Sequence, residues 1–201
     1  MLTITLANQK GGVGKSSLAL NIASGLQNAG LTVSLSELDV QETLARFAAN
    51  HPIPLVSPDT DLAGLDTDYL IIDTPPYLTS RLRDILPFTD IVLIPIRPGI
   101  ADVQALTDTL SLIESSGAKV RVYAVFNSVK HSAKAFVSEL QKAVESEGVQ
   151  VLDTVISDRL TYARSGLYGG IFSAPQDIRD AKAETEINDL IREILTRYQN
   201  A

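Results

Sequence analysis

The sequence predicts an α/β fold in which helices cover both faces of a mostly parallel, twisted sheet. Short apolar segments rich in β-branched residues alternate with segments whose apolar residues recur at helical spacing. This alternation is typical of parallel strands joined by helical crossovers. The composition agrees, because 45% of the residues are hydrophobic and only 5% are aromatic. A chain of 201 residues without linker or repeat is the size of one domain, which we expect to span 1–201.

In the first part of the chain, four apolar segments predict strands, at 2–7, 31–36, 53–56 and 69–73. A helix is expected after the first strand, because four apolar residues recur at helical spacing: Leu18, Ile22, Ala23 and Leu26. A second helical segment is expected at 41–49.

In the second part, strands are expected at 90–95, 120–126 and 149–156. The helix after the first of these has Val103, Leu106, Leu110 and Ile113 at helical spacing and ends at Gly117. The next helix covers 136–144 and ends at Gly148. A final helix is expected over 187–198, with its apolar residues on one side.

Residues 8–17, with the sequence Asn-Gln-Lys-Gly-Gly-Val-Gly-Lys-Ser-Ser, join the first strand to the first helix. Glycines at such a turn let backbone N–H groups converge on phosphate oxygens, and the helix N-terminus adds positive potential. Lys15 is expected to reach the β- and γ-phosphates and Ser16 to ligate Mg²⁺. The usual G-x-x-x-x-G-K-[ST] pattern has glycine where this chain has Gln9. The segment therefore predicts a nucleoside triphosphate site in a P-loop NTPase fold. Besides Lys15 and Ser16, the cradle residues, meaning those expected to surround the phosphates, are Lys10, Gly11, Gly12, Val13, Gly14 and Ser17.

Two carboxylates are expected at the same edge of the sheet as this loop. Asp73 ends a buried strand and is expected to bind Mg²⁺ through water, with a cap of the following turn as the alternative. Asp39 follows the second strand and is expected to orient the attacking water or the outer-shell metal waters, and its competing role is an N-cap of the 41–49 helix.

The net charge of −7 argues against a generally basic nucleic-acid-binding protein, but the charge is unevenly distributed. Residues 1–116 hold 6 Lys/Arg and 13 Asp/Glu, whereas 117–201 hold 11 of each. Within 117–142, five basic residues accompany one acidic residue, and they form either one basic face or an ordinary solvated surface. They are Lys119, Arg121, Lys130, Lys134 and Lys142.

The sequence has no cysteine, no run of about 18 apolar residues and no signal peptide, so a soluble, cytoplasmic protein without disulfides or thiolate metal sites is expected. Asn127 is either an adenine-recognition residue or an ordinary turn asparagine. His51 and His131 have no second histidine nearby in the sequence, and we expect no ligand or acid–base role for them. Three further residues belong either to a partner or DNA surface or to packing: Arg159, Tyr162 and Arg164.

Together, the motifs at 8–16, 37–41 (Glu-Leu-Asp-Val-Gln) and 71–76 (Ile-Ile-Asp-Thr-Pro-Pro) resemble the ParA/MinD family of deviant Walker A ATPases. Residues 94–102 and the pattern Arg159-x-x-Tyr162, followed by Gly169-Gly170, are similar to that family too. The similarity covers nearly the whole chain. It is greatest to the small ParA type, which lacks an N-terminal helix-turn-helix domain.

The resemblance implies an ATPase that uses ATP and Mg²⁺, is weak unless stimulated, and forms a homodimer with nucleotide between the subunits. Lys10 matches the signature lysine that contacts the partner's phosphates, and a cation supplied in trans makes hydrolysis depend on dimerisation. Asp39 matches the water-positioning aspartate, and Ser17 the residue near the α-phosphate. Glu37 stands where the family commonly has aspartate.

The function implied by the resemblance is partition or positioning on the nucleoid. In the ATP state the dimer binds DNA nonspecifically, and a ParB-like or cargo-adaptor protein stimulates the hydrolysis that releases it. The cargo is plasmid or chromosomal DNA or a protein assembly. The expected DNA contacts are Lys119, Lys130, Lys134, Arg179 and Lys182. One alternative is a MinD-like membrane switch. The apolar side of the final helix argues against it, because its pattern is more typical of packing into a core than of a membrane anchor. The other is a metabolic synthetase on the same fold, against which Lys10 counts.

Overall fold

The sheet at the centre of the molecule has seven strands in the order β3-β2-β4-β1-β5-β6-β7, and its neighbouring strands are parallel. The computed structural model describes residues 1–38, 44, 53–57, 60, 62–77 and 80–200. The strands are β1 (Leu2–Leu6), β2 (Val33–Glu37), β3 (Leu55–Val56), β4 (Tyr69–Asp73), β5 (Ile91–Ile96), β6 (Arg121–Phe126) and β7 (Gln150–Val151). This arrangement confirms the predicted fold class.

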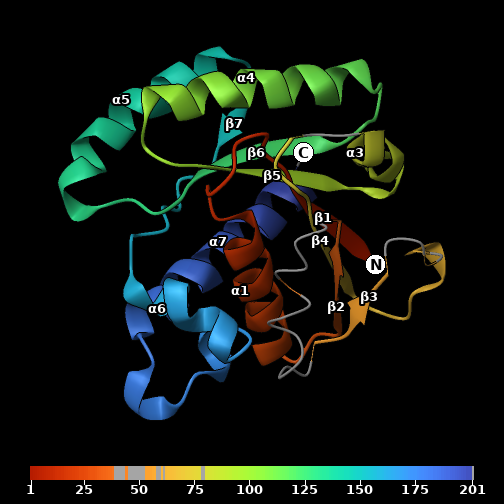
Figure 1. The fold of residues 1–201 in the computed structure, drawn as a ribbon, viewed down its shortest axis with the longest axis vertical. Coiled ribbons are helices and arrows are strands. Elements are labelled where there is room, and N and C mark those ends of the chain that lie inside the picture. The colour runs from red at the N-terminus through yellow and green to blue at the C-terminus, as the bar shows by residue number, and fades with distance from the viewer. Residues whose placement is uncertain (39–43, 45–52, 58–59, 61, 78–79, 201) are drawn as a thin grey trace.

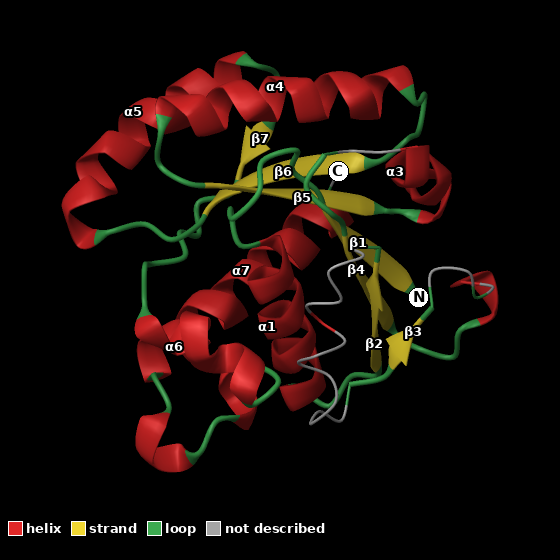
Figure 2. Ribbon diagram, viewed as in Figure 1, coloured by secondary structure: helices red, strands yellow, loops and turns green. Residues whose placement is uncertain are grey.

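Helices cover both faces of the sheet (Figures 1 and 2). Helices α4 and α5 lie over one face, above the strands in this view, while α1 and α7 lie over the other. The helices described are α1 (Lys15–Asn28), α3 (Ser80–Ile85), α4 (Ile100–Ser115), α5 (Lys134–Ser146), α6 (Leu160–Arg164) and α7 (Ala181–Gln199).

The two faces of the sheet support two separate hydrophobic cores, because successive side chains of a strand point to opposite faces. Ile71 and Leu93 pack with α1 and α7, whereas their neighbours Ile72 and Ile94 pack with α4 and α5. All six residues of β5 are buried, as expected for a central parallel strand covered on both sides.

The final helix docks into the core rather than standing away from it. Ile187, Leu190 and Ile194 are 1% exposed or less. Gly25 of α1 leaves the room this requires, since a Cβ built there would lie 2.8 Å from the Ile191 side chain. At the other end of α7, the Arg121 guanidinium donates to the Tyr198 carbonyl and lies 4.6 Å from the centre of the Tyr198 ring.

The structure departs from the expected elements in two places. The strand expected at 149–156 is only Gln150–Val151, because the N–H groups of Asp153 and Thr154 donate to the carboxylate of Glu193 on α7 rather than to a strand. The short helices α3 and α6 had not been expected at all. The helix expected at 41–49 lies outside the described residues except for Leu44.

Candidate nucleotide site

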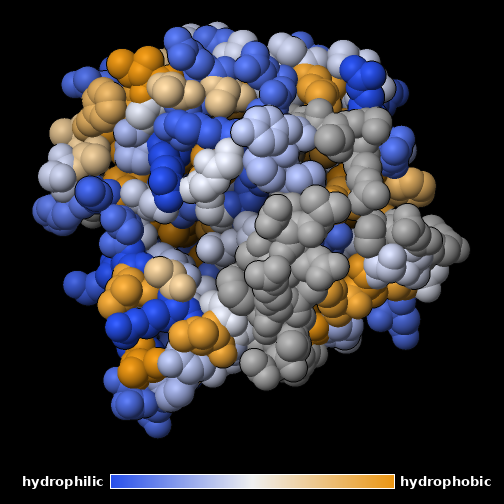
Figure 3. All heavy atoms as spheres, in the orientation of Figure 1, coloured by the Kyte–Doolittle hydropathy of each residue, from blue (hydrophilic) through white to orange (hydrophobic). Residues whose placement is uncertain are grey.

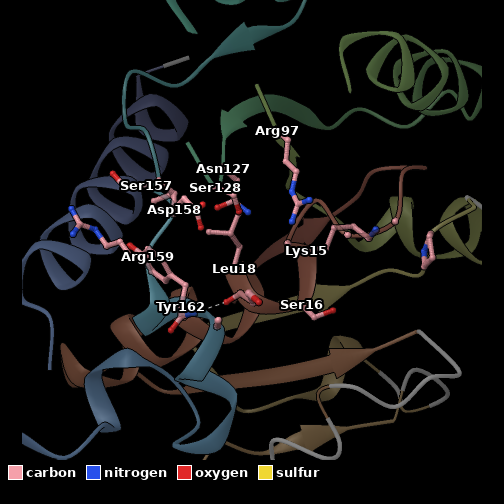
Figure 4. A pocket seen from close by; sticks show the side chains of 18 of the residues that line it. Lys15, Ser16, Leu18, Arg97, Asn127, Ser128, Ser157, Asp158, Arg159 and Tyr162 are labelled. Atoms are coloured by element: carbon pink, nitrogen blue, oxygen red, sulfur yellow. Dashed lines mark hydrogen bonds between the residues drawn. The ribbon is translucent and has the colours of Figure 1, made fainter. Parts of the chain in front are cut away.

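A pocket of about 480 Å³ lies at the carboxyl ends of the central strands, where ligands of open parallel sheets bind. It is lined by residues of the 8–17 loop, by the segments that follow β4, β5 and β6, and by residues 156–163. Figure 4 shows Lys15 and Ser16 on one side of the pocket and Ser157, Arg159 and Tyr162 on the other. The predicted cradle residues that line it are Gly11, Gly12, Gly14, Lys15, Ser16 and Ser17.

The loop has the backbone conformation that phosphate binding needs, and Asn127 holds it in place. Gly12 and Gly14 have positive φ values of 74° and 94°, which glycine adopts without strain. The Asn127 Nδ2 donates to the Val13 carbonyl over 2.7 Å. A Cβ at Gly14 would lie 2.2 Å from the same nitrogen, so only glycine fits there. Asn127 lines the pocket, and its proposed contact with adenine stays a prediction.

Lys15 lies folded over the loop. Only 6% of the residue is exposed, and its Nζ donates to the carbonyls of Asn8 at 3.1 Å and Lys10 at 3.3 Å. The Asn8 side chain in turn donates to the Pro95 carbonyl at the end of β5. This network places one cation beside the glycine turn, as a triphosphate requires.

Of the two residues expected to bind Mg²⁺, Ser16 lines the pocket, whereas Asp73 is fully buried at the end of β4 and is not among the lining residues, so their metal roles stay predictions. Among the described residues no group of three or more His, Cys, Asp or Glu is placed to hold a metal. Mg²⁺ usually binds through one or two protein oxygens, waters and the substrate phosphates. Asp39 lies outside the described residues, so its role stays a prediction. Glu37 accepts a hydrogen bond from the backbone N–H of Leu44 at 2.8 Å.

Lys10, the other lysine of the loop, does not line the nucleotide pocket. Its Nζ forms a 2.8 Å ion pair with Asp102, in the first turn of α4; the Lys10 side chain is 38% exposed and that of Asp102 only 7%. It lines a neighbouring pocket of about 500 Å³ together with Arg97 and Lys130. The two lysines of the loop are therefore held in different places.

The wall opposite the loop is held by a carboxylate of α7. Glu186 accepts hydrogen bonds from Ser157, Arg159 and Tyr162. Burial by itself raises the pKa of Glu186, but the bonds from Arg159 and Ser157 outweigh it and lower the pKa. Burial and the nearby Glu186 charge raise the pKa of Tyr162. Of the two roles left open for Arg159 and Tyr162, these contacts are packing ones, whereas Arg164 is exposed beside them.

Arg97 and Ser157 line the pocket but were missed as site residues. Arg97 directly follows β5, and its place at the carboxyl end of a central strand was a usable signal. Ser157 directly follows the strand expected at 149–156, so the same signal was available for it.

The basic residues of 117–142 do not form one face. Lys119 and Lys130 flank opposite ends of β6, which at about 3.3 Å per residue separates them by roughly 20 Å or more. Arg121 is engaged with the end of α7. Lys130 lies beside the nucleotide pocket, while Arg179 and Lys182 lie before and at the start of α7. The side chain of Lys134, like His51, is not among those described.

None of the described helices is long and apolar enough to cross a membrane. Hydrophobic and hydrophilic residues are intermingled near α6 in Figure 3, where Leu160 and Leu167 are exposed.

Two curated relatives match almost the whole chain. "Maintenance of carboxysome distribution protein A" from Halothiobacillus neapolitanus is 30% identical, with 96% of each chain covered. "Chromosome-partitioning ATPase Soj" from Thermus thermophilus is 23% identical, and the match covers 98% of this chain and 97% of that one.

The fold has a solved counterpart in a plasmid partition protein from Borrelia burgdorferi, bound to AMPPNP. Its TM-score is 0.77 at 20% identity, with 98% of this chain and 99% of that chain covered.

The family "CobQ/CobB/MinD/ParA nucleotide binding domain" matches residues 4–170. These matches confirm the predicted ATPase activity and its cofactors, ATP and Mg²⁺. With its phosphate loop, buried Lys15 and sheet-edge pocket in place, the chain belongs to the ParA/MinD family of nucleotide-binding ATPases.

Proposed function

We propose that this chain is a positioning ATPase whose ATP-bound homodimer binds DNA nonspecifically and is released when a partner protein stimulates hydrolysis. The same cycle, running on the nucleoid, moves either a DNA molecule or a protein assembly. Both kinds of cargo occur in the names of its relatives, one a carboxysome distribution protein and another a chromosome-partitioning ATPase.

The observation that carries the dimer is the position of Lys10. Its ammonium lies outside the nucleotide pocket, at Asp102, although it belongs to the phosphate loop. This position outside the pocket, with 38% of the side chain still exposed, supports a contact between Lys10 and a ligand on another molecule. In the proposed dimer that ligand is the partner's triphosphate, where the extra positive charge stabilises the transition state.

The docking of α7 favours DNA over a membrane as the surface that the ATP state binds. The apolar residues of this helix are buried against α1, and Arg121 holds its last turn. An amphipathic membrane anchor would have to leave this core first. Co-sedimentation with anionic vesicles in the presence of ATP measures this alternative directly.

The DNA step is tested by fluorescence anisotropy with a random-sequence duplex, in ATP and in ADP. We expect binding in ATP only, with an affinity that falls steeply as salt rises, because phosphate contacts release counterions. Lys130→Ala should lower the salt slope by about one unit, whereas Lys142→Ala, an exposed lysine on α5, should not change it. Absence of duplex binding in ATP at low salt would contradict the proposal.

A further inference from the structure

Two carboxylates of helix α7 hold residues 153–159, of which 156–159 line the pocket. Backbone hydrogen bonds also tie Ile156 to Phe126 at the end of β6, and Ile156 and Asp158 to Val129. After β7 ends at Val151, Glu193 accepts hydrogen bonds from the N–H groups of Asp153 and Thr154 at 2.7 and 2.8 Å. Glu186 does the same for Ser157. The two glutamates are seven residues apart, about two helical turns, and therefore lie on the same side of α7.

Glu186 is the more heavily used of the two. Its carboxylate accepts five hydrogen bonds, from the Ser157 N–H at 3.1 Å, the Ser157 hydroxyl at 2.7 Å, Arg159 at 3.1 and 2.9 Å, and the Tyr162 hydroxyl at 2.9 Å. All three donor residues line the nucleotide pocket, but Glu186 itself does not. Its side chain is 16% exposed.

The part of the nucleotide that meets this wall follows from the shape of the pocket. The phosphates lie over the glycine turn and the start of α1, since that is where the backbone N–H groups and Lys15 converge. The nucleoside then has to occupy the rest of the pocket, beside Ser157, Arg159 and Tyr162 (Figure 4).

We propose that Glu186 is a positioning residue for ATP: it fixes the wall that receives the nucleoside half of the nucleotide, without contacting the nucleotide. One carboxylate accepts bonds from a backbone amide, a hydroxyl, a guanidinium and a phenol, so it sets the positions of all three wall residues at once. The inference rests on ATP binding in this pocket but not on DNA binding or dimerisation.

The charge of Glu186 is what this role requires. Hydrogen bonds to an ionised group are stronger than neutral ones, and loss of one partner leaves the others poorly satisfied. Without the carboxylate, the Arg159 guanidinium keeps the longer 3.4 Å contact to Asp180 as its one remaining ion pair with a described residue. The wall would then sample several arrangements, and ATP binding would have to select one of them.

The experiment compares two ligands in two matched variants of the full chain. Glu186→Gln should weaken ATP binding about tenfold, as expected for the loss of a charge-assisted bond, and leave inorganic tripolyphosphate binding unchanged within about twofold. In steady-state kinetics the KM for ATP should rise in proportion, with kcat nearly unchanged. Glu193→Gln, which removes a similar amide-binding carboxylate from the same helix but away from the pocket, should change neither ligand's affinity.

Two outcomes would overturn the inference. One is an equal loss of ATP affinity in Glu186→Gln and Glu193→Gln, which would mean that the carboxylates only stabilise the fold. The other is a parallel loss of tripolyphosphate affinity, because the phosphate end should not depend on this wall. If the wild-type chain binds tripolyphosphate but not ATP, the placement of the nucleoside in this pocket is itself wrong.

A milder variant covers the case in which Glu186→Gln does not fold. Tyr162→Phe keeps the ring in place and removes the hydroxyl, which donates to Glu186 and also to the Ala183 carbonyl. It should weaken ATP binding about threefold and leave tripolyphosphate unaffected. An unchanged ATP affinity in a folded Tyr162→Phe protein would also count against the role of Glu186.

Discussion

The ion pair between Lys10 and Asp102 links the phosphate loop to helix α4. Asp102 is only 7% exposed at its side chain, and among the described residues its second oxygen has no hydrogen-bond partner. Lys10 is thus the main compensation for a carboxylate that has lost most of its water. Removing the lysine alone leaves a buried, uncompensated charge.

A double-mutant cycle at this pair should separate its structural effect from any effect on dimerisation. Lys10→Ala should lower the free energy of unfolding by about 1–2 kcal/mol, a value below that of a fully buried pair because Lys10 is half-exposed. Lys10→Ala combined with Asp102→Asn should recover most of that loss. Thermal unfolding of the four proteins measures the coupling, and strictly additive effects would show that the pair contributes nothing.

Residues with a local chemical motif could be found in the sequence, and those with distant partners could not. Lys15 and Asp73 were predicted as site residues because a glycine turn and a strand end indicate phosphate and metal chemistry. Lys15 lines the pocket, and the metal role of Asp73 stays a prediction. Glu186 gave no such signal, since its partners Ser157 and Arg159 are 29 and 27 positions away and only the fold brings them together. Arg97 was within reach of sequence reasoning, because the strand before it was predicted.

At the scale of elements, helix α7 contacts two structures that border the nucleotide pocket: helix α1 and the wall that contains Ser157. Its apolar side packs on α1, which begins at the phosphate loop, and its Glu186 carboxylate accepts hydrogen bonds from residues of the opposite wall of the pocket. A shift of this helix would therefore disturb both ends of the nucleotide site.

The two α7 carboxylates should make stability depend on acid. The folded-state pKa values of Glu186 and Glu193 are both lowered from the usual 4.5, in each case because hydrogen bonds outweigh the opposing effect of burial. Groups with a lowered pKa stabilise the fold above the unfolded value, and this stabilisation is lost as the pH falls through the folded value. We expect the melting temperature of the double variant Glu186→Gln/Glu193→Gln to fall less steeply than that of the wild type below about pH 4.5.

An exposed carboxylate outside α7 provides the matched control for these substitutions. Glu114 is exposed at the end of α4, so Glu114→Gln should follow the wild-type curve. Parallel acid curves for the wild type and the double variant would rule out the assigned role of the α7 carboxylates.

Elements with a strong hydrophobic pattern were predicted well, whereas short ones were not. Strand β5 is buried on both faces and α7 on one side, and such burial requires apolar residues at regular positions. These positions form patterns that can be recognised in the sequence. Helices α3 and α6 have only six and five residues, fewer than two turns, and show no periodicity that could be recognised. The strand expected at 149–156 was too long because Asp153 and Thr154 donate to Glu193, which interrupts the pairing with β6 between Leu152 and Ile156.

For the molecule as a whole, the pocket brings together segments that lie far apart in the sequence and meet at the carboxyl edge of the sheet. Its lining comes from the loop after β1, from the segments after β4, β5 and β6, and from residues 156–163 held by α7. A ligand there contacts segments from both halves of the sheet and residues 156–163 at once. Nucleotide binding should therefore stabilise the entire fold, and Lys15 is the residue on which this should depend most.

The stabilisation can be measured as a shift in the melting temperature with Mg²⁺ and ATP. At a nucleotide concentration of about 100 times Kd, binding adds about 2.7 kcal/mol, which for a chain of this length corresponds to a rise of roughly 5–10 °C. Lys15→Ala should abolish most of the rise, because the buried ammonium no longer meets the phosphates, while Lys142→Ala on the exposed side of α5 should retain it. If Lys15→Ala kept the full shift, the nucleotide would have to bind elsewhere. The roles proposed for Lys10 and Glu186 would then be wrong as well, because both assume that the nucleotide binds in this pocket.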